Sequence, residues 1–416
     1  MKRYLAVFLC AVLCLGCFAG CGKASPSAAD PTTARETQNQ EGANMVNLSL
    51  TNAKNLGFSA FDNMLIEYLK QSGLADQNFT VSPLSFKAAL ALAALGAEGK
   101  TLDEILGALG YTDRSQVEAW YLTVLDGVDA FDAYFDSPFV TDRGSAAYRV
   151  VNAVWQNEDL PGEFRDAYAS EIAEKLRAEV RSATAEKLTE AINAWVNEKT
   201  NGLIPQLVSD VSDASAILVN ALYLKTGWQT PFRKIGEDDF TVVTGDTVTK
   251  TYMRVTERFN YYEDDATQLV VVPLQGGVSM LFVLGDDTDL ADKLSRAQFA
   301  RVEVTVPMFD VETTLANHEL TGYLRAVGCS RMFTEDAEFD PMFTEFLYVD
   351  DIIQKAKVHI DEEGLEAAAA TAMVKYGATA VEPAEPRIFR ADRPFSFYVV
   401  NGTEAPELLF WGQIVR

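Results

Sequence analysis

Few residues in this sequence are of the types that carry out acid–base or metal chemistry. The only two histidines are His318, in a polar stretch, and His359, which alternates with apolar residues. That alternation favours an imidazole on the face of a sheet over a catalytic base. The acidic cluster at residues 335–340 lacks the spacing of a calcium loop and is typical of a solvated surface. No nucleophile elbow, zinc-protease motif, phosphate-binding loop or dinucleotide glycine pattern is present, so the sequence predicts no enzyme, no metal site and no cofactor.

Four of the five cysteines lie within the first 21 residues. Two basic residues precede an apolar run from Tyr4 to Leu15, which is too short to span a bilayer and has the form of a secretory signal. The run leads into FAGC at residues 18–21, which is similar to a bacterial lipobox with Phe where Leu is usual. The pattern predicts a lipoprotein signal peptide over residues 1–20 with Cys21 lipidated, and cleavage as an ordinary signal is the alternative. Only Cys329 lies outside this region, so the fold is expected to form without disulfides.

Residues 21–55 are rich in Ser, Pro, Thr, Ala, Asn and Gln and contain almost no large apolar residues, which is typical of a flexible tether. No linker or internal repeat divides the chain after that, so we expect a single domain over residues 56–416. The net charge of −25 argues against nucleic-acid binding and against adsorption to anionic lipid. We therefore expect an extracellular monomer, either secreted or held at the cell surface, that meets the membrane only through its N-terminal lipid.

An alanine-rich stretch, Asp361–Pro394, stands out in the globular part. Four consecutive alanines favour helix, but Gly364 before them and two prolines after them favour an extended chain. Read with a period of two, the odd-numbered residues from 365 to 373 are uncharged, whereas the even-numbered face begins with Glu366. The odd face could be buried, and most of its side chains are small enough to slide between two existing strands. On composition alone, a short exposed helix or an alanine-rich linker is the alternative.

Glu362–Ala372 (EEGLEAAAATA), followed by Phe389–Phe397 (FRADRPFSF), resembles the hinge and distal boundary of a serpin reactive-centre loop. Other segments agree in the same order along the chain: NFTVSPLS at Asn78–Ser85, INAWVNEKTNGLI at Ile192–Ile204 and ILVNALYLKTGW at Ile217–Trp228. The resemblance covers about Leu56 to Val415. It implies an α+β (mixed) serpin fold, with helices packed on three β-sheets and an exposed reactive-centre loop at about residues 362–390.

The resemblance also implies a function, which is inhibition of serine proteases as a suicide substrate. A protease would cleave the loop, and the freed hinge would insert as a new strand in the main sheet before the acyl-enzyme is hydrolysed. Counting by the family's spacing places the scissile bond at Ala378–Thr379, while a neighbouring bond, after Tyr376 or Ala380, stays open. A small residue there suits elastase-like or subtilisin-like proteases, whereas Lys375 or Tyr376 could attract other classes.

Family positions map onto two sets of residues. The hinge comprises Glu362, Glu363, Gly364, Leu365, Glu366, Ala367, Ala368, Ala369, Ala370 and Thr371. The gate in the middle of the main sheet comprises Asn78, Ser82, Ser85, Asn220 and Gln354. The chain departs from the family pattern at Gln354, where many serpins carry a histidine, and at Leu365, where Thr or Ser is usual. Met308 stands where a lysine often faces Glu362, which is expected to loosen the top of the sheet.

An inhibitory serpin is therefore the leading hypothesis. A non-inhibitory serpin fold, serving as a binding protein or a protease substrate, is the alternative. A charged or proline-rich hinge would have favoured that alternative, whereas small residues favour insertion. A hydrolase is a remote third hypothesis, because the catalytic constellation is missing.

Overall fold

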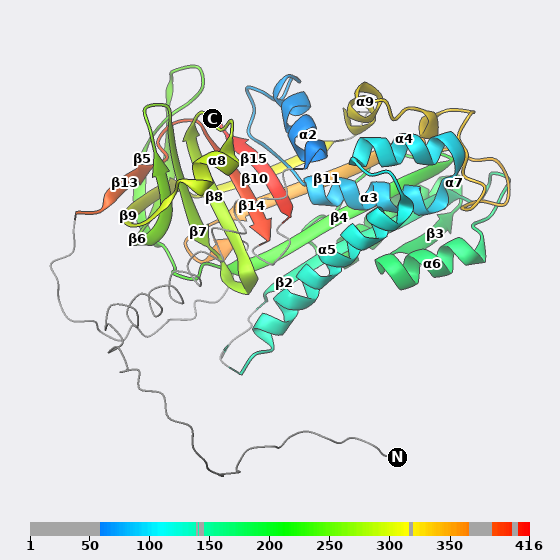
Figure 1. The fold of residues 1–416 in the computed structure, drawn as a ribbon, viewed down its shortest axis with the longest axis horizontal. Helices are drawn as coiled ribbons and strands as arrows, with labels where there is room; N and C mark the ends of the chain where they lie inside the picture. Colours follow the sequence, from blue (N-terminus) through cyan, green and yellow to red (C-terminus); the bar gives the residue numbers. More distant parts are fainter. Residues whose placement is uncertain (1–58, 139, 141–144, 316–318, 366–384, 402–406) are drawn as a thin grey trace, which may run out of the picture. The chain divides into compact units, whose positions relative to one another are not determined.

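Figure 1 shows a computed structural model of the chain, in which residues 59–138, 140, 145–315, 319–365, 385–401 and 407–416 are described. The helices of this part are α2 (Ala60–Lys70), α3 (Pro83–Gly96), α4 (Gly99–Leu109), α5 (Arg114–Phe135), α6 (Asp166–Leu176), α7 (Ala185–Lys199), α8 (Leu290–Ser295) and α9 (Glu319–Ala326). Two short 3₁₀ turns, Gln275–Gly277 and Arg331–Phe333, complete the helical elements of the described residues. None of these helices is both long and apolar enough to cross a membrane.

The larger sheet has nine strands. In spatial order they are β1 (Phe79–Val81), β15 (Leu408–Ile414), β14 (Phe395–Asn401), β8 (Val278–Gly285), β7 (Thr267–Pro273), β6 (Thr247–Glu263), β9 (Gln298–Pro307) and β13 (Arg387–Arg390), with β5 (Arg233–Thr241) also paired to β6. The 17-residue β6 pairs with β5 through its first half and with β7 through its last four residues. β6 therefore joins the strands paired to its two ends into one sheet. As a result, the described residues form two hydrogen-bonded sheets where three were expected.

The smaller sheet has six strands and contains the predicted central strand. Its order is β10 (Phe309–Leu315), β11 (Asp351–Ile360), β12 (Gly364–Leu365), β4 (Ala216–Gly227), β2 (Ala147–Asn157) and β3 (Glu179–Ala183). β4 is the strand expected over residues 217–228, and every one of its residues except Lys225 is buried.

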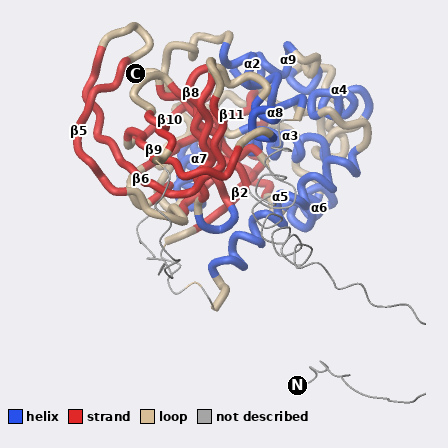
Figure 2. The backbone as a smooth tube through the Cα atoms, turned by 60° about the vertical axis from the view of Figure 1, so that its left-hand side comes forward, coloured by secondary structure: helices blue, strands red, loops and turns tan. Residues whose placement is uncertain are grey.

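Helix α3 lies at the centre of the main core. All 14 of its residues are buried, as expected for a helix that is almost entirely apolar, and its one charged residue, Lys87, is paired with Asp62 and Glu407. The Ser82 hydroxyl caps it by accepting a hydrogen bond from the Ser85 amide (3.1 Å), and Pro83 occupies the first turn, as the sequence predicts. Figure 2 shows the helices α2 to α6 gathered on one side, with β5, β6 and β9 on the other.

The six-stranded sheet is covered on both faces, and the side chains of β4 divide between them. Leu218, Leu222 and Leu224 belong to the main core around α3. Ile217, Val219 and Ala221 belong to a second, smaller core with α7. The even-numbered positions of β4 thus face the main core, and the odd-numbered positions face the second core. The residues of a strand paired with β4 can be assigned to the two faces in the same way.

Candidate functional site

The hinge begins in a tight turn that follows β11. The carboxylate of Asp361 accepts hydrogen bonds from the backbone N–H groups of Glu363 (2.8 Å) and Gly364 (3.1 Å). The Asp361 N–H donates to the Gly364 carbonyl (3.1 Å), which closes the turn. An aspartate that binds the backbone two residues ahead is a usual way to begin a turn.

Two aromatic residues fasten this turn to the end of β4. The indole of Trp228 donates to the Asp361 carbonyl (2.9 Å), and its backbone N–H donates to the Glu363 carbonyl (3.0 Å). The Phe232 N–H donates to the Glu362 carbonyl (3.1 Å). The backbone of the hinge is therefore held even though Met308 provides no lysine partner for Glu362.

The turn leads directly into β12 (Gly364–Leu365), a strand that lies between β11 and β4. Leu365 pairs with Ile360 on one side and with Thr226 on the other, both antiparallel, and Gly364 pairs with Gly227. The backbone approaches β4 very closely, because a Cβ atom on Gly364 would lie 2.4 Å from the Thr226 oxygen. Only glycine fits there. Leu365 is 1% exposed and belongs to the main core, as predicted for the odd-numbered face of the hinge.

Away from the hinge, the described residues of β4 and β11 are first unpaired with each other beyond β12 and then pair directly. β4 and β11 pair in parallel only over Ile217–Asn220 and Asp351–Gln354, and the described residues show no pairing between them from there to β12. We call this interrupted region the slot and the four-residue parallel pairing the seam. The slot is a place in a buried sheet where a further strand can be added, and it already contains the first two residues of one.

One half of the gate links the start of α3 to β11. The Ser82 N–H donates to Oε1 of Gln354 (3.0 Å), and Nε2 of Gln354 donates back to the Ser82 carbonyl (2.8 Å). Both side chains are at least 98% buried. Gln354 therefore binds Ser82 at this position, as expected for an amide that stands where many serpins have histidine. The Ser85 hydroxyl is buried without a hydrogen-bond partner among the described residues.

The other half links β4 to β2 and α5. Nδ2 of Asn220 donates to Oδ1 of Asn152, and Nδ2 of Asn152 donates to the Tyr121 hydroxyl (2.6 Å). Burial raises the pKa of Tyr121 well above its ordinary value, which keeps the phenol neutral and able to accept this bond. Oδ1 of Asn220 has no partner among the described residues.

These two halves are not joined to each other. Asn220 and Gln354 lie opposite one another in the seam, yet the hydrogen bonds of the described residues do not connect their side chains. Opening the slot downward would therefore break the backbone pairing of the seam while leaving each polar cluster intact. A buried polar group that keeps its partner during such a movement avoids a cost of about 1–3 kcal/mol.

Asn78 does not belong to the gate. Its Oδ1 accepts hydrogen bonds from the backbone N–H groups of Val415 (2.8 Å) and Arg416 (3.0 Å), and its Nδ2 donates to the Arg416 carbonyl (2.7 Å). The assignment of Asn78 to the gate is therefore wrong. Asn78 precedes the edge strand β1, where its short amide fastens the C-terminus of the chain beside β15.

His359 lies on β11, close to the hinge. Its imidazole is 40% exposed and is flanked by the carboxylates of Asp310 (3.7 Å) and Asp361 (3.6 Å). The described residues contain no group of three or more His, Cys, Asp or Glu side chains that could hold a metal ion. His318 lies outside the described residues.

Comparison with known proteins identifies the family to which this chain belongs. The family model described as Serpin (serine protease inhibitor) matches residues 52–416. The chain belongs to the serpin family. An uncharacterized serpin-like protein of Thermococcus kodakarensis is 28% identical to this serpin over 86% of its chain and 85% of the relative's.

Solved structures agree on the fold. Serpin48 of the insect Tenebrio molitor, described as a highly specific serpin, has a TM-score of 0.70 with 26% identity and covers 88% of this chain and 98% of its own. Thyroxine-binding globulin in complex with thyroxine has a TM-score of 0.72 with 21% identity and covers 88% of this chain and 99% of its own. The second likeness concerns the fold alone. The α+β serpin fold predicted from the sequence is confirmed.

Several predicted site residues of this serpin lie outside the described residues: Cys21, Glu366, Ala367, Ala368, Ala369, Ala370, Thr371, Ala378 and Thr379. The structure adds four residues at the predicted site that the sequence analysis does not identify: Asp361 and Trp228, which hold the hinge, and Asn152 and Tyr121, which bind Asn220 in a chain of hydrogen bonds. Asn152 was detectable as an amide flanked by apolar residues on both sides. Tyr121 carries no such signal.

Proposed function

We propose that this serpin inhibits serine proteases as a suicide substrate. The observation that supports the proposal is the slot with two hinge residues, Gly364 and Leu365, paired at its upper end. The protease serine would attack the carbonyl carbon of the residue before the scissile bond, and the amine of the next residue would leave, which produces an ester-linked acyl-enzyme. Insertion of the freed hinge would then carry the protease away before water hydrolyses the ester.

The pairing of β12 defines a register for the rest of the inserting strand. Leu365 lies opposite Thr226, so in an antiparallel strand each further step of two residues moves two residues back along β4. Ala367, Ala369 and Thr371 would then lie opposite Leu224, Leu222 and Asn220. The incoming strand would be antiparallel to both neighbours, whereas β4 and β11 now form a parallel pair, which is slightly less stable per residue.

We propose Ala378–Thr379 as the reactive bond and an elastase-like or subtilisin-like protease as the target. Incubating the serpin with each enzyme and separating the products in denaturing detergent tests the function directly. A complex that survives the detergent supports inhibition, and sequencing the released fragment locates the bond. Rapid cleavage without such a complex, with every enzyme tried, would indicate a non-inhibitory substrate or binding protein instead.

Replacing the residue before the scissile bond tests this assignment. Ala378→Arg should redirect the serpin to trypsin-like enzymes, because a long cation suits an acidic primary pocket and clashes with a small one. We expect complex formation with elastase to fall by at least about tenfold and complex formation with trypsin to appear. A released fragment that begins at Tyr376 or Gly377 would place the bond after Lys375 or Tyr376 instead.

We also propose that the mature chain begins at a lipidated Cys21 and is displayed outside the cell. The support is the lipobox-like FAGC at residues 18–21 after an apolar signal. The wild-type protein should sediment with membranes, and Cys21→Ser should be released in soluble form. A wild-type protein found only in the medium, with its N-terminus elsewhere, would contradict the anchor and leave the inhibitory proposal standing.

A further inference from the structure

Asp350 lies immediately before β11, at the end of the seam farthest from the hinge. One oxygen of its carboxylate accepts hydrogen bonds from the backbone N–H groups of Ser215 (2.6 Å) and Ala216 (3.1 Å), where β4 begins. Its own N–H donates to the Ala216 carbonyl (3.1 Å). Three hydrogen bonds thus close the last position of the β4–β11 pair, two of which depend on the side chain.

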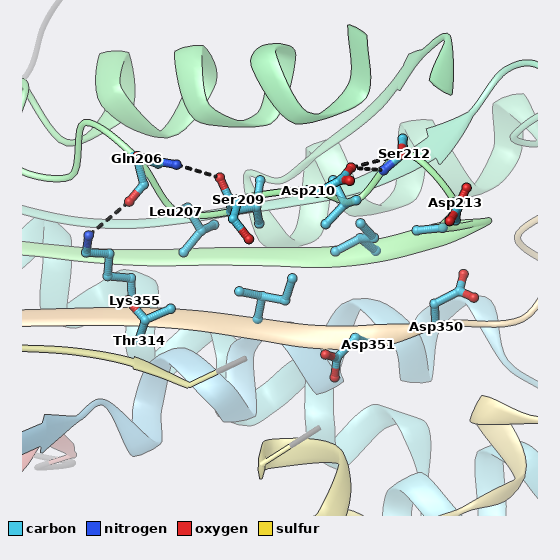
Figure 3. Close-up of a pocket in the computed structure, with 15 residues that line it drawn as sticks. Gln206, Leu207, Ser209, Asp210, Ser212, Asp213, Thr314, Asp350, Asp351 and Lys355 are labelled. Carbon is cyan, nitrogen blue, oxygen red and sulfur yellow. Dashed lines mark hydrogen bonds between the residues drawn. The ribbon is translucent and has the colours of Figure 1, made fainter. Parts of the chain in front are cut away.

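Asp350 also lines a cavity that runs along the seam. The cavity has a volume of about 630 Å³, and Figure 3 shows Asp350 and Asp351 on the side of β11, across from residues 206–213. Ile217 and Ile353, one from each strand of the seam, are also in its wall. The covering segment is tied to β11 because the Lys355 ammonium donates to the Gln206 carbonyl (3.0 Å). The cavity therefore leaves space beside the strands of the seam.

The register of β12 relates this position to the length of an inserted strand. A strand that continues from Leu365 reaches Asn220 and Gln354 with its residue 371, and it reaches Ala216 and Asp350 with its residue 375. Insertion as far as residue 370 fills the slot. Insertion of residue 371 and of the residues after it must separate the seam, and its last step must remove Asp350 from Ser215 and Ala216.

We propose that Asp350 is a latch, a positioning residue that keeps β4 and β11 together at the far end of the seam until the inserting strand arrives. The proposal rests on the insertion mechanism proposed above and adds the step that limits its completion. The latch depends on an acceptor oxygen and not on charge. Burial raises the pKa of the Asp350 carboxyl, so a neutral side chain of the same shape is not disfavoured at this position.

Two synthetic peptides with the chain's own sequence test the latch in the full-length protein. One spans residues 366–371 and ends at the gate, and the other spans residues 366–376 and must pass Asp350; both begin after the position that the chain's own Leu365 occupies. Each carries an environment-sensitive fluorophore at its C-terminal end, so that the signal reports the arrival of that end. Asp350→Ala removes both side-chain hydrogen bonds, to Ser215 and Ala216, and should speed arrival of the long peptide by at least about tenfold while leaving the short peptide unchanged.

Two matched variants separate the latch from general loosening. Asp350→Asn keeps an acceptor oxygen and should behave like the wild type with both peptides. Asp351→Asn alters the neighbouring carboxylate, which accepts from the Thr321 hydroxyl (2.7 Å) and the Ile352 N–H (2.9 Å), and should also leave the long peptide's rate unchanged. Circular dichroism confirms that each variant is folded before its rates are compared.

The outcomes distinguish the latch from the proposed function. Equal acceleration of both peptides by Asp350→Ala, or no acceleration of either, would overturn the latch while leaving inhibition by insertion intact. Acceleration of the long peptide by Asp350→Asn as strong as that by Asp350→Ala would also overturn it, because the oxygen would then be irrelevant. A wild-type protein that takes up neither peptide and forms no protease complex would contradict the insertion mechanism itself.

Discussion

The two sheets of this serpin differ in how completely their strands are paired. In the nine-stranded sheet, β14 pairs with β8 over seven consecutive positions on one side and with β15 on the other. In the six-stranded sheet, the central strands β4 and β11 share only the four positions of the seam, although β4 is almost entirely buried, β11 is partly buried and both contain several branched apolar residues. Composition alone does not explain this difference, since both sheets contain strands that pair readily.

This difference suggests separate roles for the two sheets: the nine-stranded sheet would mainly stabilise the fold, and the six-stranded sheet would accept the inserting strand. The continuous sheet, with β1, β14 and β15 at one edge, forms much of the main core, and its strand β8 pairs over seven consecutive positions with β14 and with β7. In the interrupted sheet, the described residues leave β4 and β11 unpaired with each other between the seam and β12. We therefore expect substitutions in the first sheet to change stability, and substitutions along the slot to change inhibition.

The largest expected effect is on inhibition, from a charge on the inserting face. Ala369→Glu would place a carboxylate opposite Leu222, in the main core, with no partner, at a cost of several kcal/mol. Insertion would slow while hydrolysis of the acyl-enzyme continued. We expect the detergent-stable complex to be abolished and loop cleavage to remain fast in the same gel assay.

Glu366→Arg is the matched control for Ala369→Glu, because Glu366 would lie opposite Lys225, the only residue of β4 that is not buried. It should reduce the yield of complex much less. Equal effects from the two changes would mean that the period-two alternation of the hinge is misassigned, and full inhibition by the Ala369→Glu protein would exclude strand insertion as the mechanism.

A pair of glycines compares the two sheets directly. A Cβ atom on Gly412, in β15, would lie 2.4 Å from the Phe79 oxygen and 2.5 Å from the Phe397 ring, both fixed in the core. Gly412→Ala should therefore destabilise the protein by about 2–4 kcal/mol, seen as a lower urea midpoint. The same contact distance at Gly364 involves a two-residue strand that can leave the slot, so Gly364→Ala should lower the midpoint much less.

Hydrogen exchange provides the second measurement for this pair. Gly364→Ala should expose the backbone N–H groups of Thr226 and Gly227 to exchange, because β12 would no longer pair with them. If both alanine variants lowered the urea midpoint equally, the hinge would be as rigidly built as the continuous sheet, and the contrast between the sheets would be lost.

The smallest expected effect comes from Asn78. Asn78→Ala removes three hydrogen bonds to the C-terminal backbone and should lower stability by about 1–2 kcal/mol. Because Asn78 lies beside the nine-stranded sheet, the yield of protease complex should not change. A loss of complex without a loss of stability would return Asn78 to the gate.

Local signals in the sequence were sufficient for much of the fold. Ser82 followed by Pro83 predicts the start of α3, because the cap and the first-turn proline act within a few residues. The apolar run at residues 217–228 predicts the buried strand β4, and the alternation of Leu365 with Glu366 correctly predicts that Leu365 is buried. In each case the sequence pattern that supports the prediction lies within one element.

The parts that were not predicted depend on contacts between distant elements. Asn78 and Ser82 lie four residues apart, and only the pairing of β1 with β15 separates their environments. Asn152 and Tyr121 come together because α5 packs beside β2, which no local pattern indicates. The number of sheets depends on where β6 changes from one partner strand to the next. The hydrogen bonds of Asp350 join it to Ser215 and Ala216, which precede it in the sequence by 135 and 134 positions.

The two residues of β12 have a consequence for the kinetics of loop insertion. Forming a new structural element usually begins with an unfavourable nucleus, because several residues must be ordered before their bonds stabilise them. Here the nucleus is built in advance by the Asp361 turn, the Trp228 indole and the close approach of Gly364 to Thr226. Insertion would therefore begin as propagation from an existing end, with no search for the slot, and its early rate should be independent of the length of the remaining loop.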